Sequence, residues 1–292
     1  MATKKKPKTP AKAAKTPAAL RAAAYAIATD KKKSSKQRVA AMAALPVAAG
    51  GDDRSISASI KILLDPAEPI EVRLAALQTI QASSFAFVDF APHRKEYIAA
   101  LRKVCADENL EMRQRVLGIL SREKDGYAQK KLLEGLQNPE KALVPPEKAL
   151  QLISYDVHAE VYPLAREIVA NPPNTLAKQE AVRLLAADTN SIPFLEKLFR
   201  DKTEDTETRQ IAGAAVQAAK PEEFQRQAKE VVLDASENDE VQATCLTAIT
   251  HFGNRETIEA DPALQRHVKK MSTSSSSATK KSATQFFRKF GK

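Results

Sequence analysis

The stretches EVRLAALQTI (residues 71–80), EMRQRVLGIL (111–120), ETRQIAGAAV (207–216) and EVQATCLTAI (240–249) repeat one pattern along the chain. In each, small or apolar residues stand three, four and seven positions after the third residue of the stretch. Offsets of three, four and seven define one face of an α-helix. The four stretches therefore predict one kind of half-buried helix at four places.

The same spacing can be followed through seven segments, counted from one anchor position in each. Three positions after the anchor the residue is small in six segments and valine in the seventh, and seven positions after it the residue is always Leu, Ile or Val. A sequence period between 20 and 50 residues is typical of solenoids. The anchors, spaced by 31 to 40 residues, are Arg38, Arg73, Arg113, Pro146, Lys178, Arg209 and Gln242.

A second amphipathic segment precedes most of these helices, as in HRKEYIAALRKVCA (93–106) and EEFQRQAKEVVL (222–233). Each repeat is thus predicted to be a helical hairpin. The connections contain Asp-Pro and Asn-Pro pairs, at residues 65–66, 138–139, 171–172 and 261–262. Such a pair can start a helix, because Asp or Asn caps the first turn and proline there loses no needed hydrogen bond.

The four stretches quoted above resemble the second helix of HEAT or HEAT-like repeats, in which an acidic, apolar, basic triplet precedes an Ala/Leu pattern. The basic member of the triplet is missing at Pro146 and Gln242. The resemblance covers residues 20–268. It implies an all-α protein, a right-handed α-solenoid of about seven hairpins with an extended binding surface. Structural anchor roles, with bonds to acidic or carbonyl groups of a neighbouring repeat rather than to a ligand, are expected for Arg38, Arg73, Arg113 and Arg209.

The composition agrees with an all-helical chain of 292 residues, with eight glycines and no tryptophan. The two cysteines, Cys105 and Cys245, lie far apart in apolar stretches, which argues against a disulfide scaffold and against a zinc site. No apolar run is long enough to span a bilayer. These features predict an intracellular protein, with the cytoplasm favoured and a nuclear or nucleoid location as the alternative. Import into an organelle is the less favoured interpretation of the first 29 residues, which contain no acid.

The formal charge of +10 is concentrated near the two ends. Residues 1–17 carry +6 and residues 269–292 carry +7, without a single acid, so residues 18–268 carry about −3. Low apolar content predicts that 1–17 is a disordered basic tail and 269–283 a Ser/Thr/Lys-rich linker. The predicted organisation is completed by a solenoid over 18–268 and an aromatic and basic segment over 284–292.

Lysine-rich tails bind nucleic acid without sequence preference by releasing counterions, or they only keep a protein soluble. Both interpretations of these tails stay open. The predicted polyanion-binding residues are Lys4, Lys5, Lys6, Lys8, Lys12, Lys15, Lys280 and Lys281.

Three phenylalanines close to the C-terminal end alternate with basic residues at helical spacing. They could dock in a groove of a partner, bind an anionic membrane surface or fold back on the last repeat. Docking on a partner is the favoured interpretation, and folding back is the next. The predicted partner-binding residues are Phe286, Phe287, Arg288, Lys289 and Phe290.

No nucleotide-binding, nucleophile-elbow or zinc-protease motif occurs in the sequence. The four histidines are scattered, so no metal or other cofactor is predicted, and no catalytic residue. HEAT-like arrays also include DNA glycosylases and bilin lyases, but this chain lacks the tryptophan and the basic body expected of a glycosylase. The expected function is a non-catalytic scaffold or adaptor for a protein partner, with a nucleic-acid-binding solenoid as the alternative and an enzyme as the third.

Overall fold

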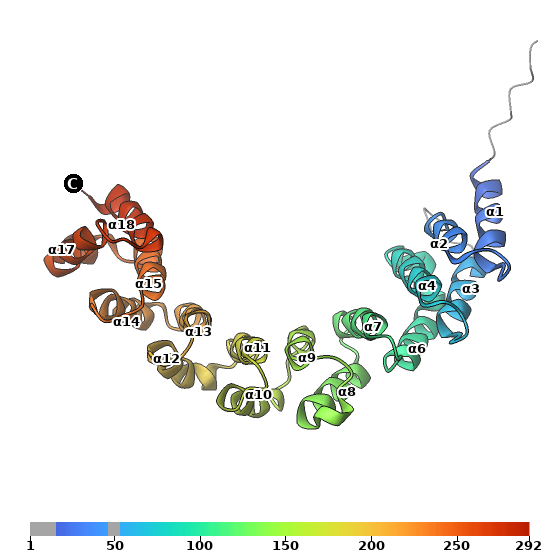
Figure 1. Ribbon diagram of the computed structural model, residues 1–292, viewed down its shortest axis with the longest axis horizontal. Coiled ribbons are helices and arrows are strands. Elements are labelled where there is room, and N and C mark those ends of the chain that lie inside the picture. The colour runs from blue at the N-terminus through green and yellow to red at the C-terminus, as the bar shows by residue number, and fades with distance from the viewer. Residues whose placement is uncertain (1–15, 46–52, 292) are drawn as a thin grey trace, which may run out of the picture. The chain divides into compact units, whose positions relative to one another are not determined.

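A computed structural model describes residues 16–45 and 53–291, and the regular structure in these ranges is helical throughout. The chain divides into two compact units, residues 1–123 and 124–292. In both, successive helices pair as hairpins that stack in chain order (Figure 1). The predicted all-α solenoid is confirmed.

The first unit consists of three hairpins, and a short helical turn precedes the third. Within the unit the second helices of the first two hairpins contact each other, and so do the first helices of the last two hairpins. The bounds are α1 Pro17–Thr29, α2 Ser35–Ala43, α3 Asp53–Leu64, α4 Ile70–Ser83, α5 Phe87–Phe90, the 3-10 turn η1 Ala91–His93, α6 Arg94–Val104 and α7 Leu110–Arg122.

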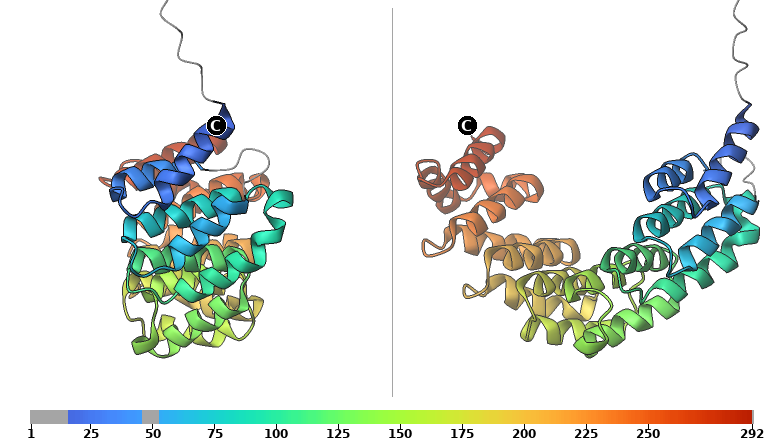
Figure 2. Two further views of the ribbon diagram at one scale, coloured as in Figure 1. Left: turned by 90° about the vertical axis from the view of Figure 1, so that its right-hand side faces the viewer. Right: turned by 45° about the vertical axis from the view of Figure 1, so that its right-hand side comes forward.

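The second unit is a longer stack of the same kind, whose second helices form one layer and whose first helices form the other (Figures 1 and 2). The bounds are α8 Gly126–Gln137, η2 Pro139–Lys141, α9 Pro146–Ile153, α10 Val161–Ala170, α11 Thr175–Leu185, η3 Thr189–Ser191, α12 Ile192–Arg200, α13 Thr206–Ala219, α14 Pro221–Leu233, α15 Asp239–Phe252, α16 Arg255–Glu259, α17 Pro262–Met271 and α18 Ser277–Phe290.

The repeated face forms the core of both units. Every residue predicted three, four or seven positions after an anchor is buried, from Ala41 in α2 to Ile249 in α15. Small residues on this face let neighbouring rings approach. A Cβ atom at Gly213 would lie 2.9 Å from the Phe199 ring and 3.3 Å from the Phe224 ring, so glycine there permits the contact of these two rings, whose centroids are 5.5 Å apart.

The Asp-Pro and Asn-Pro connections behave in two ways. Asp261 accepts a hydrogen bond from the Leu264 amide at the start of α17, with Pro262 in the first turn, and Asn138 caps η2 in the same manner. Asp65 instead closes a turn before α4, and Asn171 ends α10. Only the pairs at residues 261–262 and 138–139 therefore start helical segments.

The predicted organisation of the C-terminal end is wrong. The segment 269–283 is no linker, because α17 extends to Met271 and α18 begins at Ser277. Together α17 and α18 form one more hairpin than the seven expected, within the part of the chain that the structure describes. The predicted disordered tail 1–17 lies outside the described residues up to residue 15, and α1 already begins at Pro17.

Candidate nucleic-acid interface

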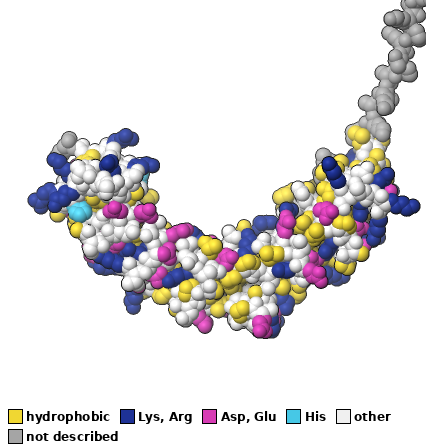
Figure 3. Space-filling model, in the orientation of Figure 1, with side chains coloured by type: hydrophobic (Ala, Val, Ile, Leu, Met, Phe, Trp, Pro, Cys, Tyr) yellow, Lys and Arg dark blue, Asp and Glu magenta, His cyan; other side chains and the backbone are white. Residues whose placement is uncertain are grey.

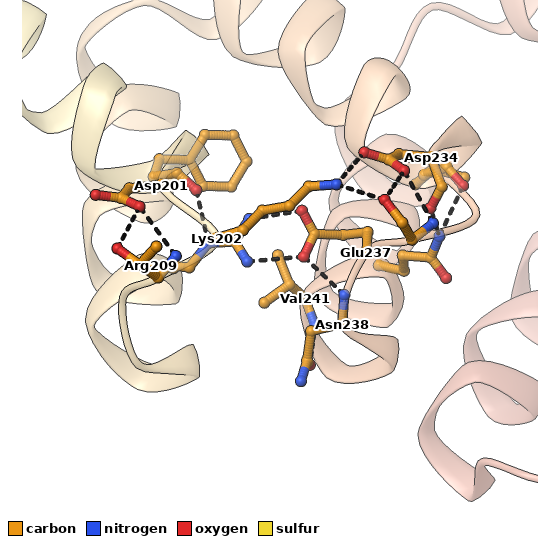
Figure 4. Close-up of polar contacts among 12 residues, drawn as sticks. Asp201, Lys202, Arg209, Asp234, Glu237, Asn238 and Val241 are labelled. Atoms are coloured by element: carbon orange, nitrogen blue, oxygen red, sulfur yellow. Dashed lines mark hydrogen bonds and ion pairs between the residues drawn. The ribbon is translucent and has the colours of Figure 1, made fainter.

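The anchor arginines lie inside the repeats. Arg209 donates from Nε to the carbonyl oxygen of Phe199 (2.9 Å) and from its two terminal nitrogens to the carboxylate of Glu237, at 2.7 Å each (Figure 4). Its side chain is only 2% exposed. The guanidinium therefore joins the end of α12 to the loop before α15, one repeat further on.

The carbonyl contact recurs with a constant separation of ten residues. Arg38 donates to Ala28 (2.9 Å), Arg73 to Leu63 (3.1 Å) and Gln242 to Val232 (3.2 Å). Two of these anchors also pair with an acid of the following repeat in the same unit. The acids are Glu68 for Arg38 and Asp107 for Arg73.

The remaining anchors vary this arrangement. Lys178 pairs with Glu204 of the following repeat, and Pro146 has no polar side chain. Arg113 donates to the main-chain oxygens of Asp107 (2.7 Å) and Glu108 (2.9 Å) in the loop just before its own helix. The contacts of all four arginine anchors are thus with protein groups.

The C-terminal hairpin extends the repeat pattern. Taking Thr279 as an anchor, the buried residues Ser282, Ala283 and Phe286 stand three, four and seven positions later. Thr279 Oγ1 donates to the carbonyl oxygen of Asp239 at the start of α15 (3.3 Å). Helix α18 therefore packs on α15 as the second helix of a further repeat.

The other end of α18 is fixed at the end of α15. Lys289 Nζ donates to the carbonyl oxygens of Thr250 (2.7 Å) and His251 (3.3 Å). An ammonium group is favourable at this place, because the last carbonyls of a helix lack partners within the helix and carry partial negative charge. The two helices consequently run parallel, start beside start and end beside end.

The favoured role of the C-terminal phenylalanines in docking a partner is therefore corrected. Phe286 is 0% exposed and Phe290 is 3% exposed, and their rings contact each other with centroids 5.2 Å apart. Phe287 is half-buried and meets Phe286 edge-on. Burying these rings against the last repeat removes them from water, which is the alternative of folding back. Of the five predicted partner-binding residues, Arg288 and Lys289 are exposed.

The solvent side of this hairpin is strongly basic. Residues 262–291 contain seven lysines and arginines and neither aspartate nor glutamate. All seven are exposed, and no ion pair joins any of them to an acid within the described ranges. Figure 3 shows Lys and Arg side chains gathered over the end of the unit that α17 and α18 form. We call these residues the basic hairpin face: Arg266, Lys269, Lys270, Lys280, Lys281, Arg288 and Lys289.

His267 lies on the same hairpin and is half-buried. Burial lowers the pKa of its imidazole, and the nearby Lys270 lowers this pKa further. The ring is therefore neutral at pH 7, and the charge of the face comes from the lysines and arginines.

The predicted polyanion-binding residues are divided by the structure. Lys280 and Lys281 belong to the basic hairpin face on α18. The six N-terminal lysines, Lys4, Lys5, Lys6, Lys8, Lys12 and Lys15, lie outside the described residues. Sequence reasoning missed that Arg266 and Lys269 share a folded hairpin with Lys280, since the Ser/Thr-rich composition indicated a linker.

A groove of about 950 Å³ lies beside this hairpin, between α13, α14, α15, α16 and α17. Phe252 at the end of α15 lines it and is 70% exposed. Gln225 of α14 also lines it, and the side-chain nitrogen of Gln225 is buried without a hydrogen-bond partner. The sequence gives one weak signal for this site, a phenylalanine just past the repeated face and directly before Gly253.

Two kinds of feature are absent from the described part of the chain. No three His, Cys, Asp or Glu side chains in residues 16–45 and 53–291 converge as ligands for a metal ion. No helix in these ranges is long and apolar enough to cross a membrane.

The stacked hairpins define a helical solenoid that agrees with the resemblance to HEAT-like repeats. No protein-family model and no curated protein matches the chain. Among solved structures, one of human deoxyhypusine hydroxylase in complex with glycerol is similar, with 14% sequence identity and a TM-score of 0.36. The alignment covers 81% of this chain and 96% of that chain.

This similarity corrects two expectations, namely that the chain is a non-catalytic scaffold or adaptor and that it is no enzyme. The similar solved structure is an enzyme by its title, so a helical architecture of this kind is no ground for excluding catalysis. A TM-score of 0.36 at 14% identity assigns no activity to this chain.

Proposed function

We propose that the chain binds the phosphate backbone of nucleic acid through the basic hairpin face. The observation that carries the proposal is the concentration of seven exposed cationic side chains, without an acid, on one folded hairpin. Lysine and arginine that neutralise phosphates release condensed counterions, and this release drives binding without sequence preference. A nucleic-acid partner would place the chain in the cytoplasm, nucleus or nucleoid, which imaging of the tagged protein would test.

The ordering of the hairpin supports the proposal further. On a flexible linker, cations must be ordered when they bind, at a cost in conformational entropy. Here Lys280 and Lys281 stand on a helix whose two ends are held to α15 through Thr279 and Lys289. The cations are therefore largely in place before a ligand arrives, which favours binding.

Fluorescence anisotropy with a labelled 20-base-pair DNA duplex tests the proposal on the full-length chain. We expect Lys280→Gln/Lys281→Gln to weaken binding and to flatten its salt dependence. The matched control is Lys36→Gln/Lys95→Gln, which removes two exposed lysines from the first unit. Equal affinities of the two double variants would contradict the proposal, as would binding to anionic phospholipid vesicles in the absence of any binding to DNA or RNA.

A further inference from the structure

The groove beside the basic hairpin face is built from helix ends of two successive repeats. Its apolar wall includes Ile249 of α15, Ile258 of α16 and Leu264 of α17. Its volume of about 950 Å³ is in the range of sites that enclose small organic groups. Because α16 and α17 form part of the wall, the groove is continuous with the basic hairpin.

Phe252 presents an aromatic ring to this groove. Its side chain is 70% exposed, although it is the last residue of a helix whose other apolar residues are mostly buried. The turn behind it is tight, because a Cβ atom at Gly253 would lie 2.5 Å from Ile258 Cδ1 and 2.6 Å from the Ile249 carbonyl oxygen. The main chain at the ring is therefore closely packed while the ring itself is exposed to solvent, as stacking on a planar group requires.

Gln225 of α14 supplies a polar group in the same groove. Its side-chain nitrogen is buried and has no hydrogen-bond partner, which is unfavourable until an acceptor is supplied. An amide side chain can donate and accept hydrogen bonds at once. The edge of every nucleobase carries donors or acceptors that match such a group.

Three of the four charged residues that line the groove are paired with protein groups. Arg226 pairs with Glu223 and Glu230, and Lys229 pairs with Asp261. Glu222 also lines the groove and has no ion-pair partner among the described residues, so the groove itself does not attract a phosphate, and the neighbouring cations would have to hold it. The basic hairpin lies next to the groove, because Lys289 of α18 bonds to the carbonyl oxygen of Thr250, two residues from Phe252.

We infer that this groove holds an unpaired nucleobase, which stacks on Phe252 and bonds to the amide of Gln225 while the basic hairpin face holds the adjoining phosphates. The inference rests on the proposed function and adds a preference for single strands. Aromatic stacking platforms beside a cationic surface bind single strands, since bases are free to leave the stack there. A peptide with an apolar side chain would use the same walls but not the neighbouring cations.

The test compares a 20-nucleotide single strand with a duplex of equal length, by anisotropy on the full-length chain. We expect Phe252→Ala to weaken single-strand binding about tenfold, the effect of one lost stacked base, and to leave duplex binding unchanged. Phe252→Trp should retain the single-strand preference, whereas Phe252→Leu, which keeps an apolar side chain, should not. Phe87→Ala is the matched control, because Phe87 in the first unit is 72% exposed.

Two results would overturn the inference. One is a single-strand preference that Phe252→Ala leaves unchanged, and the other is a Phe252→Leu variant that binds single strands like the parent chain, as an apolar peptide site would allow. The proposed function fails separately, if Lys280→Gln/Lys281→Gln leaves binding to both nucleic acids unchanged. A fluorescent base analogue in the single strand adds a direct readout, because stacking on Phe252 should quench its emission in the parent chain and not in Phe252→Ala.

Discussion

Arg209 and Glu237 form a bidentate ion pair between two successive repeats, with both side chains at most 3% exposed. Such a pair is costly to break on one side only, because the remaining charge stays buried without a partner. The pair therefore joins neighbouring hairpins more firmly than a surface salt bridge would.

Replacing Arg209 by alanine should lower the free energy of unfolding by about 3 kcal/mol, because Glu237 would be left buried and unpaired. Arg113→Ala should cost about 1 kcal/mol, since Arg113 is half-buried and donates to the main-chain oxygens of Asp107 and Glu108. Urea denaturation followed by circular dichroism measures both values. Equal losses of unfolding free energy for the two variants would show that the buried ion pair stabilises the fold no more than the contacts of Arg113 do.

The ion pairs also predict a loss of stability in acid. Hydrogen bonds from Arg38 and Arg209 hold the pKa of Glu68 and of Glu237 below the usual value. A carboxylate whose pKa is lowered by folding stabilises the fold above its unfolded pKa of about 4.3, and this contribution is lost as the pH falls through the folded pKa. The midpoint temperature of thermal unfolding should therefore be nearly constant from pH 7 to 5 and should decrease below pH 4.5.

A double variant serves as the control for this pH effect. Arg209→Met/Glu237→Leu removes both charges and should reduce the slope of stability against pH in the acid range. An identical slope in the parent chain and the double variant would assign the acid sensitivity to other carboxylates.

The C-terminal hairpin should be folded in the isolated protein. Phe286→Ala removes a fully buried ring from the contact of α18 with α15 and should destabilise this hairpin by about 3 kcal/mol. Limited proteolysis should then cut residues 272–290 much faster than in the parent chain. The control, Phe287→Ala, removes a half-exposed ring and should have a smaller effect. Rapid cleavage of this segment in the parent chain would contradict the hairpin.

The cysteines should be unreactive while the chain is folded. Burial raises the pKa of the Cys245 thiol to about 12, so almost no thiolate exists there at pH 8. Cys105 is equally buried. A thiol reagent should label neither side chain in buffer and both in urea, as mass spectrometry would show. Fast labelling of Cys245 in buffer would mean that α15 opens readily.

The repeated helices could be predicted because their signal is local and repeated. The positions of Ala76, Leu77 and Ile80 after Arg73 define a helical face on their own, and the same face recurs at every later anchor. Even Gln242, which breaks the pattern of charged anchors, makes the same carbonyl contact ten residues back as Arg209. Hydrophobic spacing therefore determined the register where the anchor residue varied.

The last hairpin was missed because its signal is weaker. Thr279 stands where most repeats have a longer polar side chain, and Ala283 stands where most have Leu, Met or Val. Serines around them lowered the apolar content to that of a linker, although Phe286 keeps the position seven residues after the anchor. The burial of Phe286 depends on α15, which no local pattern around residue 286 contains.

The candidate site could be predicted only in part. Lys280 and Lys281 stand out as charges, but their union with Arg266 on one folded face depends on how α17 and α18 pair. The exposure of Phe252 and the unsatisfied nitrogen of Gln225 depend on contacts among several helices of two repeats. Such contacts join residues distant in sequence and leave no pattern of spacing.

We expect the N-terminal lysines and the basic hairpin face to make separable contributions to nucleic-acid binding. Deleting residues 1–15 removes six cations that lie outside the described residues. If the folded face carries the binding, the truncated chain should keep most of its affinity for duplex DNA in a filter-binding assay at 100 mM salt. Loss of nearly all affinity on this deletion would assign the binding to the N-terminal lysines instead.

The most direct test is the dependence of the duplex dissociation constant on salt concentration, for the parent chain and for a variant with Arg266, Lys269, Lys270, Lys280 and Lys281 all changed to Gln. Each cation that contacts a phosphate of duplex DNA contributes about 0.9 to the slope of log K against log salt. We predict a slope that is smaller in magnitude by at least about 2 in the variant, with an unchanged helical content. A variant with the parent slope and the parent affinity would contradict the assignment of nucleic-acid binding to this hairpin.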